Sequence, residues 1–497
     1  MAARSGFSFG PFQLDPQRRT LRRDGELVTI SVRSVELLSV LAARSGHIVS
    51  KDELVTAAWA EVAVTDNSLA QAIAQLRRTI GDAWVSTHPR RGYRFDGAIT
   101  RIALPESDEV LDALLAPHRA WIEGRAALET MEGSRVQPAR EAFELVLAAD
   151  PGQAAAHVGL ANACIFQFEM TRADATRDRG MLAKAIEHAR HACRLDPEYG
   201  EAWGALGFAL ARAGSGAANP PAGNPDDARA ALRRAMQLEP DNWHHVLRLS
   251  YGSWGEERLS AARRTLTLMP HLPMAHWLGA TVHVARQAFP EAERELQSGL
   301  GNPHAGGVAL HWLTGLLHLA RDEDDAAMAA FTRELANEPR GLLYSRECCA
   351  NTHYAIGALH LRRGRHAEAV PSFQEALVRL PAHPLARIGL ARALFQLGRM
   401  DEAATLVSGL LEGDRAQGAA AEHEAGGESH VDVAIARAVG LCLRHRESDA
   451  APLVADALEH APAGPTGWLL PVEPILHVQA HHQLWKDALD RLRNRAT

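Results

Sequence analysis

The sequence predicts two kinds of fold in one chain of 497 residues, an N-terminal α+β domain over residues 1–100 and an all-α superhelical solenoid over 118–497. Three observations lead to this division. Short β-type runs flank three helical periodicities within the first 100 residues. The stretch 101–117 mixes polar residues with proline, so it is predicted as a linker. Beyond it, small residues, an aromatic or leucine, and a proline return with a period of about 34 residues.

The chain is predicted to begin with a small sheet. Residues 9–15 and 20–28 are typical of short strands, and Asp24-Gly25 is a turn signal within the second stretch. The following apolar segment, residues 32–43, is predicted as a helix. Its apolar face holds Val35, Leu38 and Leu41 or Ala42.

A second helix is predicted from a capping box. Ser50 can cap the free backbone amides of the helix, and the carboxylate of Glu53 can reach back to it, so the helix runs from here to Trp59.

The third helix, residues 67–80, has an apolar face and a polar face. The spacing of 3.6 residues per turn places one apolar stripe against the core. This stripe contains Leu69, Ile73, Leu76 and Ile80. Gln71, Gln75 and Arg78 repeat the same spacing on the other side. Glutamine can pair with the edge of adenine, and arginine with guanine or phosphate, so the polar face has the chemistry for a DNA major groove. An ordinary solvated surface is the alternative.

A basic hairpin is predicted directly after this helix. Residues 84–87 and 93–95 have the character of short strands, and 89–92 supply a turn with proline and glycine. Arg90 and Arg91 then lie at the tip, where two guanidinium groups can reach phosphates or a narrow minor groove.

The order of sheet, two helices, polar-faced helix and basic hairpin resembles the OmpR/PhoB-type winged helix-turn-helix family over roughly residues 5–98. The resemblance implies that Gln71 and Gln75 face bases, that Arg77 and Arg78 grip phosphate or the groove edge, and that Thr87 and the wing arginines contact backbone or minor groove. The DNA-contacting set that it implies is Ser50, Lys51, Ser68, Gln71, Gln75, Arg77, Arg78, Thr87, Arg90, Arg91 and Tyr93.

Two points stay open within this resemblance. Ser50 and Lys51, at a helix start, could meet a phosphate through free backbone amides, but a plain N-cap explains Ser50 equally well. His88 stands where the family usually has an apolar residue, and base choice at positions 71 and 75 varies, so no operator sequence follows.

Charge is divided unevenly along the chain. Residues 1–100 hold 13 Lys and Arg against 10 Asp and Glu, whereas the remaining 397 hold 40 against 50. The resulting net of +3 is modest for a DNA-binding domain. We therefore expect two copies to bind adjacent half-sites.

The region after residue 117 resembles tetratricopeptide (TPR) repeats. The clearest unit has Gly364 at the turn between its two helices. Its signature residues are Gly357, Ala369, Phe373, Ala376 and Pro381. Neighbouring units hold Gly315, Ala327, Phe331 and Pro339 before it, and Leu390, Ala391, Gly398 and Ala403 after it. Weaker copies predict about eight to ten helix pairs, with loops at 214–225 and 418–429.

Such an array forms a groove that usually holds a peptide or partner protein, and sometimes a small ligand or another copy of the chain. The signature residues themselves are expected to be core.

The sequence offers little for catalysis. It contains no GxxxxGK[ST] loop and no assembled nucleophile, base and orienting group, so no enzyme activity, cofactor or metal is predicted. His477 and His481 could share a zinc ion on a helix, but a packing or surface role is favoured. Five cysteines without a CxxC pair fit a reducing cytoplasm. The sequence contains no apolar run of 18 residues, so no membrane span is predicted.

The function predicted from the sequence is a cytoplasmic, sequence-specific DNA-binding transcription regulator, most simply an activator. Its layout resembles regulators of the HilA type, and of the CadC type without the membrane span. Predicted partners are double-stranded DNA, RNA polymerase, and a protein or peptide on the repeats, with self-association possible through them and no membrane. The alternative is a repeat scaffold whose winged helix serves protein contacts.

Overall fold

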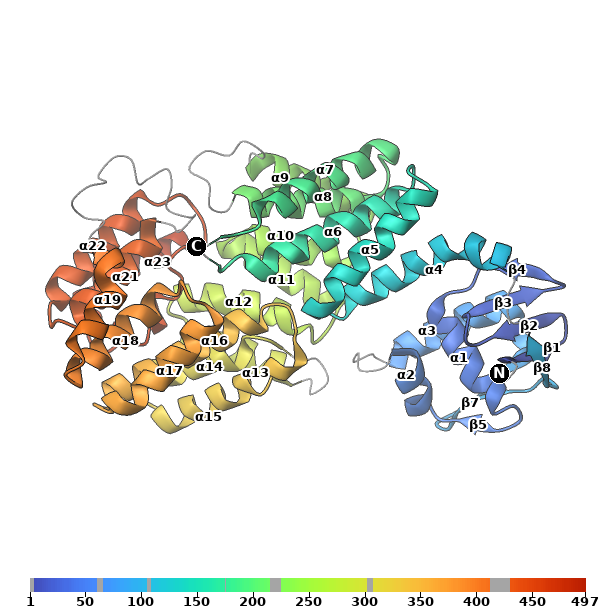
Figure 1. The fold of residues 1–497 in the computed structure, drawn as a ribbon, viewed down its shortest axis with the longest axis horizontal. Coiled ribbons are helices and arrows are strands. Elements are labelled where there is room, and N and C mark those ends of the chain that lie inside the picture. Colours follow the sequence, from blue (N-terminus) through green and yellow to red (C-terminus); the bar gives the residue numbers. More distant parts are fainter. Residues whose placement is uncertain are drawn as a thin grey trace. The chain divides into compact units, whose positions relative to one another are not determined.

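The structure is a computed structural model that describes residues 4–59, 66–104, 109–174, 176–214, 225–301, 307–411 and 430–497. The chain divides into two compact units, Met1–Ile122 and Glu123–Thr497, which are described separately below (Figure 1).

Two small antiparallel sheets frame the first unit. The larger has the strand order β4-β3-β2-β1-β8, and the smaller has β5-β7-β6. The strands are β1 (Arg4–Phe9), β2 (Phe12–Asp15), β3 (Thr20–Arg23), β4 (Glu26–Val28), β5 (Ile48–Val49), β6 (Val85–His88), β7 (Gly92–Phe95) and β8 (Thr100–Leu104). The predicted Asp24-Gly25 turn joins β3 to β4, with both residues at positive φ.

The linker predicted for 101–117 is corrected by the structure. Residues 100–104 form β8, which pairs with β1 and completes an edge of the sheet, with Ser8 opposite Thr100. After residues outside the described part, α4 (Glu109–Glu129) covers the rest of the stretch. The free edge of β1 supplies the hydrogen-bonding partner that this short strand needs.

Three α-helices lie between the strands of the first unit: α1 (Val32–Ala43), α2 (Lys51–Trp59) and α3 (Asp66–Ile80). The predicted stripe of α3 is buried, with Leu69, Ile73, Leu76 and Ile80 between 0 % and 4 % exposed. An aromatic cluster joins the two sheets, because Phe9 lies 5.1 Å from Phe95 and 5.2 Å from Trp84 between ring centroids.

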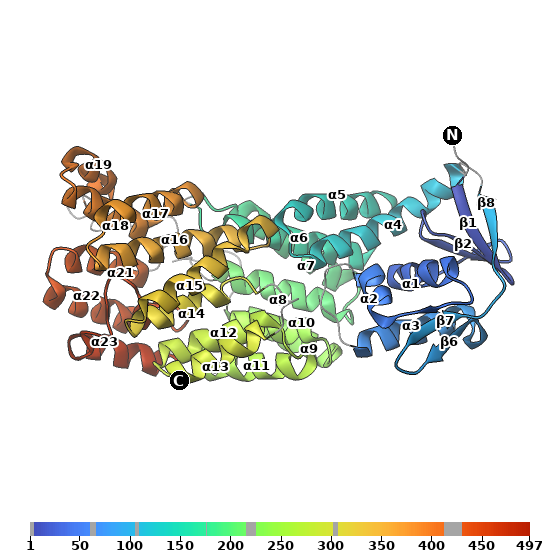
Figure 2. The ribbon, with the colours of Figure 1, turned by 90° about the horizontal axis from the view of Figure 1, so that it is seen from below.

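The second unit consists of successive helix pairs, visible as stacked layers in Figure 2. Its helices are α5 (Gly133–Ala149), α6 (Ala154–Thr171), α7 (Arg179–Leu195), α8 (Gly200–Gly214), α9 (Pro225–Leu238), α10 (Trp243–Gly252), α11 (Gly255–Leu268), α12 (Pro273–Ala285), α13 (Phe289–Leu300), α14 (Leu310–Ala320), α15 (Asp324–Leu335), α16 (Ser345–Arg362), α17 (His366–Arg379), α18 (Pro384–Gln396), α19 (Met400–Leu411), α21 (His430–Cys442), α22 (Glu447–His460) and α23 (His482–Arg495). The expected all-α repeat fold is confirmed.

The glycine and phenylalanine of the repeat signature explain how the layers stack. A Cβ on Gly357 of α16 would lie 2.7 Å from the Phe373 ring of α17, and a Cβ on Gly389 of α18 would lie 2.5 Å from it. The buried ring therefore lies between two helices that approach it closely because they present no side chain there. Gly364, at φ +68°, makes the predicted turn between α16 and α17.

Contacts between distant repeats close the second unit on itself. The guanidinium of Arg172 donates to both carboxylate oxygens of Glu347, at 2.8 and 3.0 Å, although 175 residues separate them. At the other end, α23 packs beside α11 and α12, and Arg286 donates to the backbone oxygen of Ala496 at 2.8 Å.

The two loops predicted within the repeats fall mostly outside the described residues, which omit 215–224 and 412–429. Within the described helices, none is long and apolar enough to cross a membrane.

Candidate nucleic-acid interface

The polar face of α3 is exposed. Gln71, Gln75 and Arg78 all lie on the side opposite the buried stripe, one helical turn apart. The Nε atom of Arg78 donates to the carbonyl of Ala74 at 3.4 Å, which keeps its side chain along the helix surface. The two glutamines thus present amide groups to solvent from a rigid element, as a groove-reading helix requires.

The hairpin β6–β7 forms as predicted, and backbone geometry fixes its tip. Arg90 adopts the left-handed conformation at φ +63°, and the amide of Arg91 donates to the carbonyl of His88 at 3.0 Å. Gly92 has a φ of +131°, and a Cβ there would lie only 1.9 Å from the carbonyl oxygen of Val49 in β5. Glycine is therefore required at this position, since both the backbone angle and the neighbouring strand exclude a side chain.

Arg77 links α3 to the hairpin. Its Nε donates to the carbonyl of Val85 at 2.9 Å and its Nη2 donates to Oγ1 of Thr87 at 2.7 Å. The guanidinium also lies 5.9 Å from the ring centroid of Tyr93. One side chain thus holds the helix and the wing in a fixed relation, a role that the sequence pattern did not reveal.

The capping box at the start of α2 is confirmed. The amide of Glu53 donates to Oγ of Ser50 at 3.2 Å, and Ser50 donates its own amide to the Glu53 carboxylate at 3.3 Å. Arg44 donates to the same carboxylate at 2.6 Å, and this hydrogen bond holds the pKa of Glu53 below its ordinary value. The Glu53 carboxylate thus occupies the Ser50 amide at this helix start, beside the half-buried Lys51.

The strands of the wing carry their own polar contacts. A hydrogen bond from Ser86 and the adjacent Arg94 lower the pKa of Asp96, and Arg94 lies 2.5 Å from its carboxylate. His88, which replaces an apolar residue of the family pattern, lies 3.2 Å from Oγ of Ser86 through Nε2. The half-buried imidazole is therefore accommodated by a polar neighbour within the hairpin.

The structure separates the predicted contact residues by accessibility. Six are exposed: Gln71, Gln75, Arg78, Thr87, Arg90 and Arg91. Ser50, Lys51, Ser68 and Arg77 are half-buried. Tyr93 is only 7 % exposed and belongs to the core of the first unit.

The histidines considered for zinc are not arranged for it. His477 and His481 precede α23 rather than sharing a helix, and His477 Nε2 lies 3.0 Å from the carboxylate of Asp322. Across the part of the chain that the structure covers, no group of three His, Cys, Asp or Glu side chains could hold a metal ion.

Comparison with known protein families identifies both regions of the chain. Residues 25–95 match the family described as "Transcriptional regulatory protein, C terminal", and residues 360–422 match the family described as "Tetratricopeptide repeat".

Known proteins resemble the N-terminal region. The transcriptional activator CadC of Escherichia coli (strain K12) is 28 % identical over 108 residues, which are 20 % of this chain and 21 % of CadC. The solved DNA-binding domain of E. coli CadC is 27 % identical, with a TM-score of 0.19, and covers 20 % of this chain and 100 % of that one. The Klebsiella pneumoniae RstA DNA-binding domain, solved in complex with the RstA box, is 30 % identical, with a TM-score of 0.17, over 18 % of this chain and 96 % of that one. The chain thus spans about a fifth of CadC.

Proposed function

Because the chain joins an OmpR/PhoB-type winged-helix domain to tetratricopeptide repeats, we propose that it is a sequence-specific DNA-binding transcription regulator. The observation that carries this proposal is the exposed row Gln71, Gln75 and Arg78 on α3, held beside a basic wing by Arg77. In this arrangement α3 enters the major groove and the wing reaches the adjacent backbone or minor groove.

The residues divide into three roles. Gln71 and Gln75 read base edges, since their amides are exposed and can pair bidentately with adenine. Arg78, Thr87, Arg90 and Arg91 grip the phosphate backbone or the groove edge, and Ser68 and Lys51 contribute at the borders of this surface.

The remaining predicted residues support the surface. Arg77 and Tyr93 set the position of the wing, because the arginine bonds to β6 and lies over the buried tyrosine ring. Ser50 caps α2, where Glu53 already accepts its amide hydrogen bond.

For the repeats we propose binding of a protein or peptide partner, or self-association that places two winged helices on adjacent half-sites. Two copies are favoured because the N-terminal 100 residues carry a net charge of only +3, which gives a single copy little phosphate affinity. Activation through RNA polymerase is part of this proposal and rests on the family resemblance alone.

A selection of duplexes from a random library by the full chain tests the proposal. We expect enrichment of a motif with two half-sites, and a Gln71→Ala/Gln75→Ala variant that retains duplex binding but loses the motif. The affinity should fall steeply with salt concentration. If the full chain binds no duplex even at low salt, the repeat scaffold with a non-DNA-binding winged helix becomes the better description.

A further inference from the structure

The segment between α22 and α23 lies against the repeats through its side chains. It contains the short helix η4 (Leu470–Val472), and its buried apolar residues are Leu470, Val472, Leu476 and Val478, each at most 2 % exposed. Trp468 meets Trp277 of α12 and Trp312 of α14 edge to face, with ring centroids 6.0 and 6.5 Å apart. Val472 belongs to the same core cluster as residues of α12, α14 and α16, whereas Leu470, Leu476 and Val478 pack in the cluster formed mainly by α21, α22 and α23.

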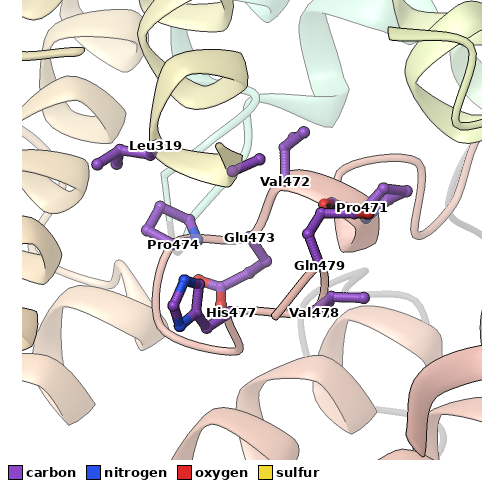
Figure 3. A pocket seen from close by; sticks show the side chains of 9 residues that line it. Leu319, Pro471, Val472, Glu473, Pro474, His477, Val478 and Gln479 are labelled. Atoms are coloured by element: carbon purple, nitrogen blue, oxygen red, sulfur yellow. Dashed lines mark hydrogen bonds between the residues drawn. The ribbon is translucent and has the colours of Figure 1, made fainter. Parts of the chain in front are cut away.

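Two polar anchors fix this segment. Tyr354 of α16 donates its hydroxyl to Glu473, whose other carboxylate oxygen accepts the amide of Leu476 at 2.6 Å. Burial raises the pKa of Glu473 to about 7. His477, in the left-handed conformation at φ +49°, lies 3.0 Å from Asp322 in the turn between α14 and α15. Figure 3 shows Glu473 and His477 on the same loop, next to the helix that carries Leu319.

The backbone of the segment bonds to itself. The amides of Trp468, Leu470 and Val472 donate to carbonyls three residues earlier, and Gln479 donates its side-chain amide to Pro471. The described contacts with α12, α14 and α16 are therefore made by side chains, as in a docked peptide, and not by a shared backbone ladder.

The fit is close but leaves polar groups unpaired. The cavity that remains beside Leu319 and Glu473 has a volume of about 10 Å³, about the space of one water molecule. Within the described residues, the buried indole N–H groups of Trp277 and Trp312 have no hydrogen-bond acceptor. Each unpaired donor costs about 1–3 kcal/mol.

We propose that the face formed by α12, α14 and α16 is a peptide-binding site and that residues 468–478 are its resident, intramolecular ligand. The partner that fits this face is a peptide of the same chemistry that folds into the same turns. It carries a tryptophan, an aliphatic residue four positions later, and an acidic side chain directly after that residue. Such a partner must compete with the resident segment, so the segment limits access to the repeats.

This inference deepens the partner-binding role proposed above and does not depend on DNA. The segment is flanked by exposed residues, Pro462 and Ala463 on one side and Ala480 and His481 on the other, where a linker can be joined. Its replacement also removes three side chains from the cluster that they share with α22 and α23, so folding of the variant is checked by circular dichroism. The probe is a fluorescent synthetic peptide of residues 466–480, titrated by anisotropy against the full chain and against a variant whose residues 468–478 are a Gly/Ser linker of equal length.

We expect micromolar binding to the linker variant, on the order of tenfold or more weaker binding to the wild type, and no binding of a peptide that carries Trp468→Ala. If the linker variant does not fold, the full-length Trp468→Ala chain takes its place. This substitution weakens the packing of residues 468–478 on the repeats and leaves the other side chains of the segment unchanged. A folded variant that does not bind the peptide more tightly than the wild type would show that residues 468–478 are a fixed structural element and overturn the proposal. Since the titration contains no DNA, failure of the DNA proposal leaves its result intact.

Discussion

At the residue scale, Gln71 and Arg91 occupy exposed positions with different chemistry. An amide that pairs with a base edge discriminates between sequences, whereas a guanidinium on a phosphate strengthens binding to every sequence. Gln71→Ala should therefore cost roughly 1–3 kcal/mol on the selected site and little on random DNA. Arg91→Ala should weaken both and reduce the salt slope by about 1.

Fluorescence anisotropy on the selected and a scrambled duplex, over a series of salt concentrations, measures both effects. Equal losses on the two duplexes for both variants would contradict this division between base reading and phosphate contact.

Gly92 offers a second test at this scale, with Gly25 as a matched control. Both residues have positive φ, but a Cβ at Gly92 would lie 1.9 Å from a backbone oxygen, whereas a Cβ at Gly25 would have nothing within 4 Å. Gly25→Ala should cost about 1 kcal/mol from backbone conformation alone. Gly92→Ala should cost about 3 kcal/mol or more, because it also forces β5 away from β7.

Scanning calorimetry of the full chain can compare these two variants, with DNA affinity as a second readout. A Gly92→Ala chain as stable as Gly25→Ala would show that β5 moves freely, and the rigid wing described above would be wrong.

At the scale of elements, the sequence predicted most of what is local. The bounds 32–43 agree with α1, and the capping box placed the start of α2, because periodicity and caps are encoded within a few residues. Strand β8 was missed since its partner β1 lies almost the whole first unit away in sequence. The role of Arg77 was missed for the same reason, because an arginine that binds phosphate and one that binds a neighbouring strand look alike in the sequence.

The repeat helices carry a prediction about layer spacing. Gly357→Ala places a methyl group within 3 Å of the buried Phe373 ring, so it should destabilise the chain by about 1–3 kcal/mol. Gly440 of α21 is the control, since a Cβ added there would have nothing within 4 Å. Gly440→Ala should stabilise the chain by about 0.5–1 kcal/mol through helix propensity. Urea denaturation measures both, and a neutral Gly357→Ala would show that the layers can separate without cost.

At the scale of the whole second unit, contacts between segments far apart in the sequence determine which helix faces are covered. Arg172, directly after α6, binds Glu347 of α16, and Trp468 and Val472 pack against α12 and α14. Neither contact could be predicted from the repeat period. Residues 468–478 have no repeat pattern, and Arg172 and Glu347 are 175 positions apart in the sequence. The repeats predict stacked helix pairs, while these contacts decide which of their faces stay accessible.

Glu473 makes the second unit sensitive to pH. The groups that face its carboxylate are the Tyr354 hydroxyl and the amides of Ile475 and Leu476; Cys442 is also near, and its thiol pKa is raised by burial, then by Glu447 and Glu473. Burial raises the pKa of Glu473 from 4.5 in the unfolded chain to about 7 in the folded one. Between these values unfolding releases a proton, so a rise in pH favours the unfolded state. The stabilisation is complete below pH 4.5 and is lost as the pH passes 7.

The variant Glu473→Gln should remove this dependence while keeping a hydrogen-bond acceptor for Tyr354. Relative to the variant, the wild type should lose on the order of 3 kcal/mol of unfolding free energy across the window, most of it between pH 5 and 7.5. Urea denaturation of both chains at several pH values measures the difference in their unfolding free energies. The contributions of groups that titrate in both chains cancel in this difference. Glu375→Gln is the control, because Arg379 holds the pKa of Glu375 below 4.5, outside the window. If the unfolding free energies of the wild type and Glu473→Gln change with pH in the same way across pH 5–7.5, the Glu473 carboxyl is ionised in the folded chain. Tyr354 would then donate its hydrogen bond to a charged group.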